Sequence, residues 1–212
     1  MKMKKLSSIL VLALSIVMMA SCASQKLTKD QKQAEKNIKS EVRQMTKDGW
    51  KVAPGNLSMD LQLKESYAKA LEKDDRGYDK FVAGEAMSIG ENYDAALFQA
   101  SNLAKLDLAA KLQTEVTELI DTKLANKQLT QKQAASLTAS AASSKNLVSQ
   151  RLGRVVTPVK MYRDLDNGNV EVRTVIYYSH EMAIDIVKQS MREELEKQAD
   201  DLSKQLDTIL GF

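Results

Sequence analysis

The sequence is poor in residues that carry catalytic, metal-binding or cross-linking chemistry. Its 212 residues include one cysteine, one histidine, one tryptophan and two prolines. A single cysteine, Cys22, leaves no partner for an internal disulfide, so the fold must depend on its hydrophobic core. Transition-metal sites combine histidine and cysteine ligands and are therefore not expected. Without a Gly-Lys-Ser/Thr phosphate loop, nucleotide hydrolysis is not expected either, and we predict no cofactor.

The N-terminus has the three parts of a secretory signal. Lys2, Lys4 and Lys5 precede an uncharged run over 6–20, which is too short to remain as a membrane-spanning helix. The run closes as Met19-Ala20-Ser21-Cys22, which resembles the lipobox of bacterial lipoproteins. The resemblance implies cleavage after residue 21, lipid on Cys22, and a membrane as the partner of the lipidated tether 22–27.

Charge balance excludes a nucleic-acid footprint. The whole chain has 31 basic and 28 acidic residues, and removal of the three signal lysines leaves 28 of each. The mature chain is therefore neutral, and we expect no nucleic-acid partner.

The residues after Cys22 guide the expected location. Ala23 is not the aspartate that retains lipoproteins in the inner membrane of some bacteria, and Ser24-Gln25-Lys26 lacks the acidic run linked to surface export. By that resemblance we expect the outer membrane, on its periplasmic face, with the cell surface as the alternative.

Apolar residues at steps of three and four predict several helices. The first covers 28–47 and stops at Gly49, and the second covers 58–73 after the Pro54-Gly55 turn. A long helix follows Gly90 with one continuous apolar face, and it bends or breaks within 126–130 before another helical run. The alanines at the start of the long helix would let it lie close to a sheet.

A strand and a β-hairpin are expected around these helices. We predict a strand over 80–89, and a hairpin in which 155–164 and 170–178 flank Asn167-Gly168. A two-residue turn there would place Met161 opposite Thr174 and Val159 opposite Ile176. Pro158 indicates that the first hairpin strand is an edge of the sheet or lacks partners nearby.

Four residues are candidates for an interaction surface. Tyr162, Arg173 and Tyr177 are expected on the wetter hairpin face, and tyrosine and arginine are favoured in interfaces. The alternative is that one of the remaining helices covers this face. Trp50 is a candidate for ligand stacking, although a lone tryptophan near a helix end more often fills a gap in a core.

The C-terminal region, 181–212, reads as one amphipathic helix capped by Ser179. Its apolar stripe from Ile184 to Ile209 approaches a coiled-coil seam. Two outcomes remain open: the stripe packs on its own domain, or it drives self-association or docking with an envelope protein.

Gly84 on the expected strand is followed by a helix with small residues at regular spacing, including Ala96, Ala100 and Ala104. Together with the lipobox and the late hairpin, this arrangement resembles the LPP-twenty family of small bacterial outer-membrane or surface lipoproteins. The likeness covers roughly 77–178. It implies an α+β domain without known catalytic residues.

Two patterns imitate functional sites. Ser88, in Ala86-Met87-Ser88-Ile89-Gly90, sits where a nucleophile elbow would place its serine, and His180 is the only histidine that could act as its base. The alternative reading is an ordinary strand end and a solvated helix residue. Asp164, Asp166 and Glu171 could gather around a cation, but the segment does not fit a calcium loop.

The expected fold is α+β, with a small antiparallel sheet (a strand plus a C-terminal hairpin) packed against long helices. The expected segments are the signal peptide 1–21, the tether 22–27, a helical segment 28–75, a core domain 76–180 and the helix 181–212. We expect a lipid-anchored envelope protein with a structural or protein-interaction role rather than an enzyme. The alternatives are a periplasmic small-molecule or glycan-binding module and, third, a hydrolase that uses Ser88.

Overall fold

The structure is a computed structural model that describes residues 29–197, 201–204 and 206–207. The predicted signal, the tether and Cys22 lie outside the described residues. Contacts divide the chain into residues 1–37 and residues 38–212.

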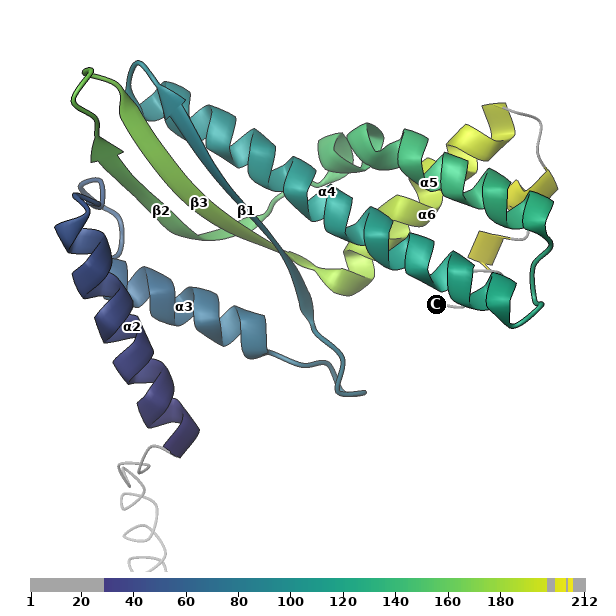
Figure 1. The fold of residues 1–212 in the computed structure, drawn as a ribbon, viewed down its shortest axis with the longest axis horizontal. Helices are drawn as coiled ribbons and strands as arrows, with labels where there is room; N and C mark the ends of the chain where they lie inside the picture. Colours follow the sequence, from purple (N-terminus) through teal and green to yellow (C-terminus); the bar gives the residue numbers. More distant parts are fainter. Residues whose placement is uncertain (1–28, 198–200, 205, 208–212) are drawn as a thin grey trace, which may run out of the picture. The chain divides into compact units, whose positions relative to one another are not determined.

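The α+β prediction is confirmed. The elements are α2 (Lys29–Lys47), α3 (Met59–Leu71), β1 (Phe81–Gly90), α4 (Tyr93–Ala125), α5 (Gln131–Arg151), β2 (Val156–Asp164), β3 (Val170–Ser179), α6 (His180–Lys197) and the 3-10 turn η2 (Asp201–Lys204) (Figure 1). The three strands form an antiparallel sheet in the order β1-β3-β2, so β3 is central and both β1 and β2 are edges. Pro158 therefore lies on an edge strand, as its missing N–H predicts.

Local signals set most of the boundaries. Gly49 has φ of +83° and ends α2 in a Schellman motif, in which Trp50 N–H donates to the Met45 carbonyl at 3.0 Å. Asn92 caps α4 by accepting from Ala95 N–H. The predicted break after α4 is confirmed, because Thr130 and Gln133 form a capping box that starts α5.

The sheet is covered on both faces. Side chains alternate along each strand, so one face carries Val159, Met161, Val175 and Tyr177 and packs against α3 and the part of α2 from Ile38 onward. The other face packs against α4. On that side Gly84 of β1 allows a close approach, since an added Cβ would overlap the carbonyl oxygen of Ala104. Ala96, Ala100 and Ala104 are fully buried there, as their small size predicts.

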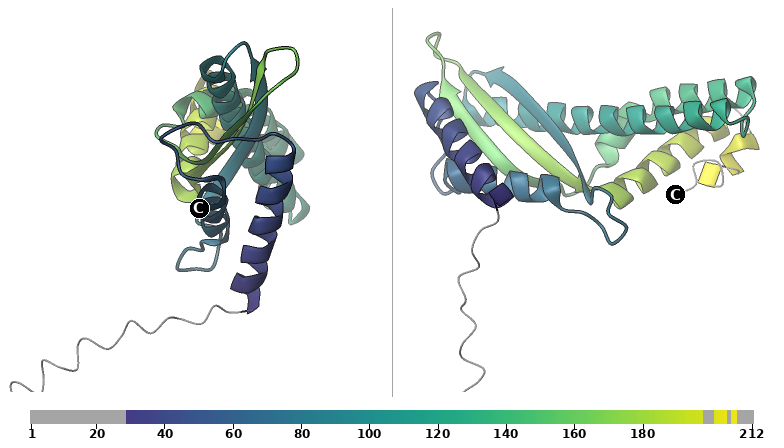
Figure 2. Two further views of the ribbon diagram at one scale, coloured as in Figure 1. Left: turned by 90° about the vertical axis from the view of Figure 1, so that its left-hand side faces the viewer. Right: turned by 60° about the horizontal axis from the view of Figure 1, so that its bottom comes forward.

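Beyond the sheet, α4, α5 and α6 run side by side as a three-helix bundle (Figures 1 and 2). Its core is formed by large apolar side chains of all three helices, including Leu112, Val116, Ile120, Leu137, Val148, Val187 and Met191. The described members of the C-terminal stripe pack on their own domain: Ile184, Val187, Met191, Leu195, Leu202 and Leu206 are all buried within the chain. Of the predicted helix 181–212, the structure describes α6 over His180–Lys197, and Asp201–Lys204 form a 3-10 turn rather than a regular α-helix.

The hairpin forms where it was predicted, but its register differs by one residue. Val159 pairs with Val175 and Met161 with Arg173, rather than with Ile176 and Thr174. The cause is the turn: Leu165 N–H donates to the Asn169 carbonyl, which closes a three-residue loop ending at Gly168 with φ of +83°. Such a loop places glycine in the left-handed conformation and shifts the pairing relative to a two-residue turn.

Candidate functional site

The one-residue shift separates the side chains predicted to share a surface. Tyr162 pairs with Val172 and lies on the α4 face, where its ring meets that of Tyr93 edge-on with centroids 5.3 Å apart. Arg173 and Tyr177 lie on the opposite face. When one strand shifts by one residue relative to its partner, its side chains move to the opposite face of the sheet relative to those of the partner. The predicted surface of Tyr162, Arg173 and Tyr177 therefore does not form.

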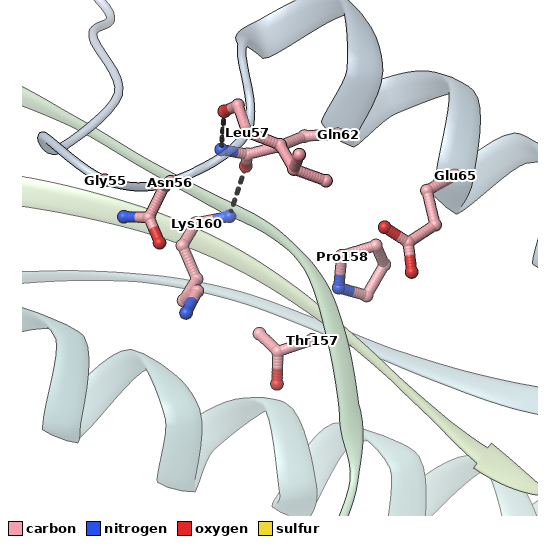
Figure 3. Close-up of a pocket in the computed structure, with 8 residues that line it drawn as sticks. All are labelled: Gly55, Asn56, Leu57, Gln62, Glu65, Thr157, Pro158 and Lys160. Carbon is pink, nitrogen blue, oxygen red and sulfur yellow. Dashed lines mark hydrogen bonds between the residues drawn. The ribbon is translucent and has the colours of Figure 1, made fainter.

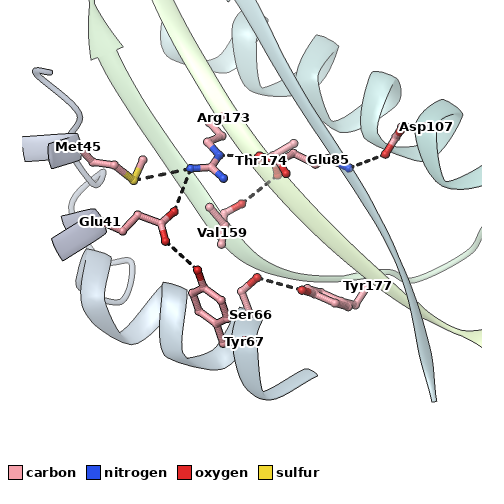
Figure 4. A network of polar contacts seen from close by, with 10 residues as sticks. All are labelled: Glu41, Met45, Ser66, Tyr67, Glu85, Asp107, Val159, Arg173, Thr174 and Tyr177. Atoms are coloured by element: carbon pink, nitrogen blue, oxygen red, sulfur yellow. Dashed lines mark hydrogen bonds and ion pairs between the residues drawn. The ribbon is translucent and has the colours of Figure 1, made fainter. Parts of the chain in front are cut away.

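Arg173 and Tyr177 are covered by α2 and α3, which is the alternative raised for that face. Arg173 donates to Glu85 of β1 at 2.7 Å and contacts Glu41 of α2 at 3.4 Å (Figure 4). Tyr177 is only 4% exposed, and its hydroxyl lies 3.1 Å from Ser66 of α3. Arg173 thus joins the helical layer to two strands, and neither side chain forms an open surface.

The same network extends to the exposed side of α3. Tyr67 donates to the second carboxylate oxygen of Glu41 at 3.0 Å. Burial raises the pKa of the Tyr67 hydroxyl, and the hydrogen bond to Glu41 raises it further, so Tyr67 stays protonated as a donor at neutral pH. Glu41 is therefore held from two sides, by the Tyr67 hydroxyl and the Arg173 guanidinium.

Trp50 is part of the core rather than a ligand platform. It is 8% exposed and packs with residues of α2, α3 and the sheet. The guanidinium of Arg163 lies 5.0 Å from its ring centroid and covers it as a cation–π partner. A sugar or other ring could not stack on Trp50 without displacing these side chains.

The structure does not bring Ser88 and His180 together. Ser88 pairs with Val172 near one end of β1, whereas His180 follows Ser179, which pairs with Phe81 at the other end. Along β1, Ser88 and Phe81 are seven residues apart, which corresponds to about 24 Å. Ser88 donates instead to Gln99 at 2.7 Å, and His180 Nε2 lies 2.9 Å from Glu115. These two residues therefore cannot act as nucleophile and base on one substrate.

Two of the three acidic residues of the hairpin, Asp164 and Glu171, form ion pairs. Lys51 pairs with Asp164 at 2.7 Å, and Arg163 pairs with Glu171 at 2.6 Å. Within the described part of the chain, no group of three or more histidine, cysteine, aspartate or glutamate side chains is placed to hold a metal ion. Over the same residues, no helix is long and apolar enough to cross a bilayer.

A hollow of about 300 Å³ lies along the outer side of β2, and Trp50 does not line it (Figure 3). Its walls combine the 55–57 loop, Gln62 and Glu65 of α3, and residues 157, 158 and 160. This volume is at the lower end of the range of ligand pockets.

The edges of the sheet are more informative, because an edge strand presents unpaired N–H and C=O groups that can pair with another chain. The β2 edge is largely closed. Lys51 exchanges two backbone hydrogen bonds with Tyr162, and the buried side-chain oxygen of Gln62 accepts from Lys160 N–H at 2.7 Å (Figure 3). Pro158 has no N–H to offer.

Two side chains of α4 occupy part of the first half of the β1 edge. Glu85 N–H donates to the Asp107 carboxylate at 3.0 Å, and the Lys111 ammonium donates to the Ala83 carbonyl at 2.9 Å. Both bonds show that the odd-numbered residues of β1 direct their backbone groups away from β3 (Figure 4 shows the bond to Asp107).

The second half of the β1 edge is open. In an antiparallel ladder the outward direction alternates, so Met87 and Ile89 also point their N–H and C=O groups away from β3. No backbone or side-chain group among the described residues bonds them. Their side chains are 56% and 50% exposed on the face covered elsewhere by α2 and α3.

A ridge of α4 forms the other wall of this open stretch. Gln99, Leu103, Asp107 and Lys111 follow one another at steps of four and therefore share one side of the helix. Gln99 contacts Ser88 and Asp107 contacts Glu85, so Leu103 lies between these levels beside the strand, and it is 45% exposed. We call Met87, Ser88, Ile89 and Leu103 the open β1 edge.

Periodicity did not identify the open β1 edge, because nothing in β1 itself shows which strand will flank it. The usable signal was the pair Met87 and Ile89, two apolar side chains on the strand face opposite the alanine-lined helix. Comparison with known proteins adds no relative: no family model matches the chain, and no curated protein or solved structure is significantly similar to it. The LPP-twenty resemblance therefore stays a prediction.

Proposed function

We propose that this chain is a lipid-anchored bacterial envelope protein that acts by binding another protein along the open β1 edge, without catalysing a reaction. The observation that supports this role is the contrast between the open stretch and the neighbouring parts of both edges. Side-chain or loop groups bond the Ala83 carbonyl and the Glu85 N–H on β1, and the Lys160 N–H and both Tyr162 backbone groups on β2. Met87 to Ile89 combines unpaired backbone groups with exposed apolar side chains, which natural proteins normally avoid.

Strand addition is a common way to bind protein segments. Backbone hydrogen bonds to the edge provide affinity, and alternating side chains contact the flanking surface. Here Met87 and Ile89 would contact the added segment on one side and Leu103 on the other. The edge is held by the sheet and by α4, so it is already in the conformation that such binding requires.

The anchoring part of the proposal is based on the sequence. Lipid on Cys22 would hold the protein to a membrane, and we place it at the periplasmic face of the outer membrane. Replacing Cys22 by serine should abolish metabolic labelling with palmitate and move the protein from the membrane fraction to the soluble fraction. Unchanged labelling or membrane retention would exclude the lipid anchor.

Photo-crosslinking in the living host tests the interaction part. A photoreactive phenylalanine analogue at position 87 of the full chain should yield a discrete adduct with one protein, which a second change, Ile89→Lys, should abolish. The matched control is position 182, because Met182 has the same 56% exposure but lies on a helix. Equal adducts at both positions, or no adduct at position 87, would contradict the proposed role.

A further inference from the structure

Acidic residues follow the open β1 edge. Glu91 and Asp94 follow β1 directly, and Asp166 lies in the hairpin loop at the same end of the sheet, because Gly90 pairs with Val170. All three side chains are exposed, and no described lysine or arginine forms an ion pair with any of them. The nearby cations Lys51 and Arg163 are already paired with Asp164 and Glu171. The unpaired charged residues that directly follow β1, Glu91 and Asp94, are therefore both negative.

This charge disfavours a second copy of the chain as the occupant. To pair all four outward groups, Met87 of one copy must face Ile89 of the other in an antiparallel arrangement. The next outward positions would then place Glu85 opposite Glu91, and the two-fold symmetry repeats that contact. Like charges directly opposite each other destabilise strand pairing. Strand pairing between copies would therefore bring carboxylates together at both ends of a short contact.

From this geometry we infer that the occupant is an extended segment of another protein with a basic residue before three consecutive apolar residues. The inference rests on the proposed function and specifies the partner of the same edge. In an antiparallel pairing, the segment residues opposite Ile89 and Met87 put their side chains beside these two. The residue between them points to the other face, beside Leu103. All three positions thus favour apolar side chains.

The basic residue has a defined place in this segment. The added segment runs antiparallel to β1. Its residue that lies two positions before the one opposite Ile89 is therefore beside Glu91. Lysine or arginine there meets a carboxylate that has no ion-pair partner among the described residues. The segment leaves the edge after the residue opposite Met87, because Asp107 occupies the Glu85 N–H. The predicted pattern is basic-any-apolar-apolar-apolar.

Fluorescence anisotropy with synthetic peptides tests the inference on the purified full-length protein. The probe is a labelled Lys-Thr-Val-Ile-Val-Ser peptide. One comparison peptide replaces Lys by Glu, and a second carries N-methyl groups on both valines, which removes the N–H donors without changing charge. We expect each comparison peptide to bind about tenfold or more weakly than the probe, since one lost ion pair or backbone pair of 1.4 kcal/mol has that effect.

Protein variants identify the surface. Met87→Lys should weaken binding of the probe by about tenfold or more, whereas Met182→Lys, at a position of equal exposure, should not change it. Glu91→Lys should reverse the preference, so that the Glu peptide binds better than the Lys peptide. Circular dichroism spectra would confirm that each variant keeps its fold.

The outcomes separate this inference from the proposed function. Equal affinity for the Lys and Glu peptides, with loss in Met87→Lys, overturns the charge pattern while the edge still binds strands. Binding that survives valine N-methylation overturns strand addition. A mass that doubles in light scattering and returns to the monomer in Met87→Lys identifies a second copy as the occupant and overturns the inference. Failure of both peptides to bind also overturns it, whereas the crosslinking experiment judges the proposed function independently.

Discussion

His180 Nε2 lies 2.9 Å from both carboxylate oxygens of Glu115, a contact that joins the start of α6 to the middle of α4. The hydrogen bond to Glu115 raises the pKa of His180 above its ordinary value of 6.5, and the charge of Glu115 adds to this effect. Burial of the ring acts in the opposite direction. Of the more distant charges, Asp79 also raises the pKa of His180 and Arg76 lowers it.

The pair should make stability depend on pH. A raised pKa in the folded state means that His180 stabilises the fold fully below about pH 6.5 and loses this contribution as the pH rises through the folded-state pKa. Urea unfolding at pH 5.5 and 8.5 should give His180→Gln a smaller stability deficit at the higher pH. We expect the deficit at pH 5.5 to be about 1 kcal/mol or less, because Glu115 is 41% exposed. A deficit that grows with pH would contradict this assignment.

Close packing of β1 on α4 at Gly84 is the basis of a second prediction. Gly84→Ala places a methyl group against the Ala104 carbonyl oxygen and within 2.9 Å of Leu108 Cβ, so strand and helix must move apart. We expect a loss of about 1–3 kcal/mol in the free energy of unfolding. Gly153→Ala is the control: an added Cβ there meets nothing within 4 Å, and stability should change by about 0.5 kcal/mol or less.

Arg173 should stabilise the attachment of α2 and α3 to the sheet. Arg173→Met removes the cation that Glu41 and Glu85 share, while it keeps much of the side-chain volume. The side chain is 25% exposed, so the expected loss of about 1–3 kcal/mol lies between values for exposed and buried ion pairs. Arg154→Met, at an exposed position without an ion pair in the described structure, should leave denaturant midpoints unchanged.

Trp50 offers a direct optical test of the core. It is the only tryptophan in the chain, and it is 8% exposed beneath Arg163. Iodide should quench its fluorescence weakly in the native protein and strongly in the unfolded protein. Trp50→Ala should cost about 3–5 kcal/mol, as expected for a large aromatic side chain removed from a core. Strong quenching in the native protein, or a stability unchanged by the substitution, would show that Trp50 is exposed and available for ligand contact.

The sequence predicts the elements well because their signals are local. The Schellman glycine Gly49, the capping box at Thr130 and the four-residue spacing of alanines on α4 each depend on a few neighbouring residues. The hairpin register was predicted wrongly because Asn-Gly occurs in both two-residue and three-residue hairpin loops. The length of the loop decides whether Tyr162 and Arg173 lie on the same face of the sheet.

The candidate site is harder to predict, because its character depends on distant segments. Asp107 and Lys111 bond the Glu85 N–H and the Ala83 carbonyl of the β1 edge from a helix more than twenty positions later in the chain. Likewise, the burial of Trp50 and Tyr177 depends on how α2 and α3 pack on the sheet. Residue type and periodicity do not encode these long-range choices.

The 33-residue helix α4, about 50 Å long, belongs both to the layer that covers the sheet and to the three-helix bundle. Its first turns lie beside the open β1 edge, while Leu112, Val116 and Ile120 lie in the core of the three-helix bundle. Reshaping the edge would therefore require loss of core packing far from it, which makes the edge preorganised. The conformational entropy lost on binding should come almost wholly from the incoming segment, so constraining that segment in an extended form is the direct route to a tight inhibitor of the interaction.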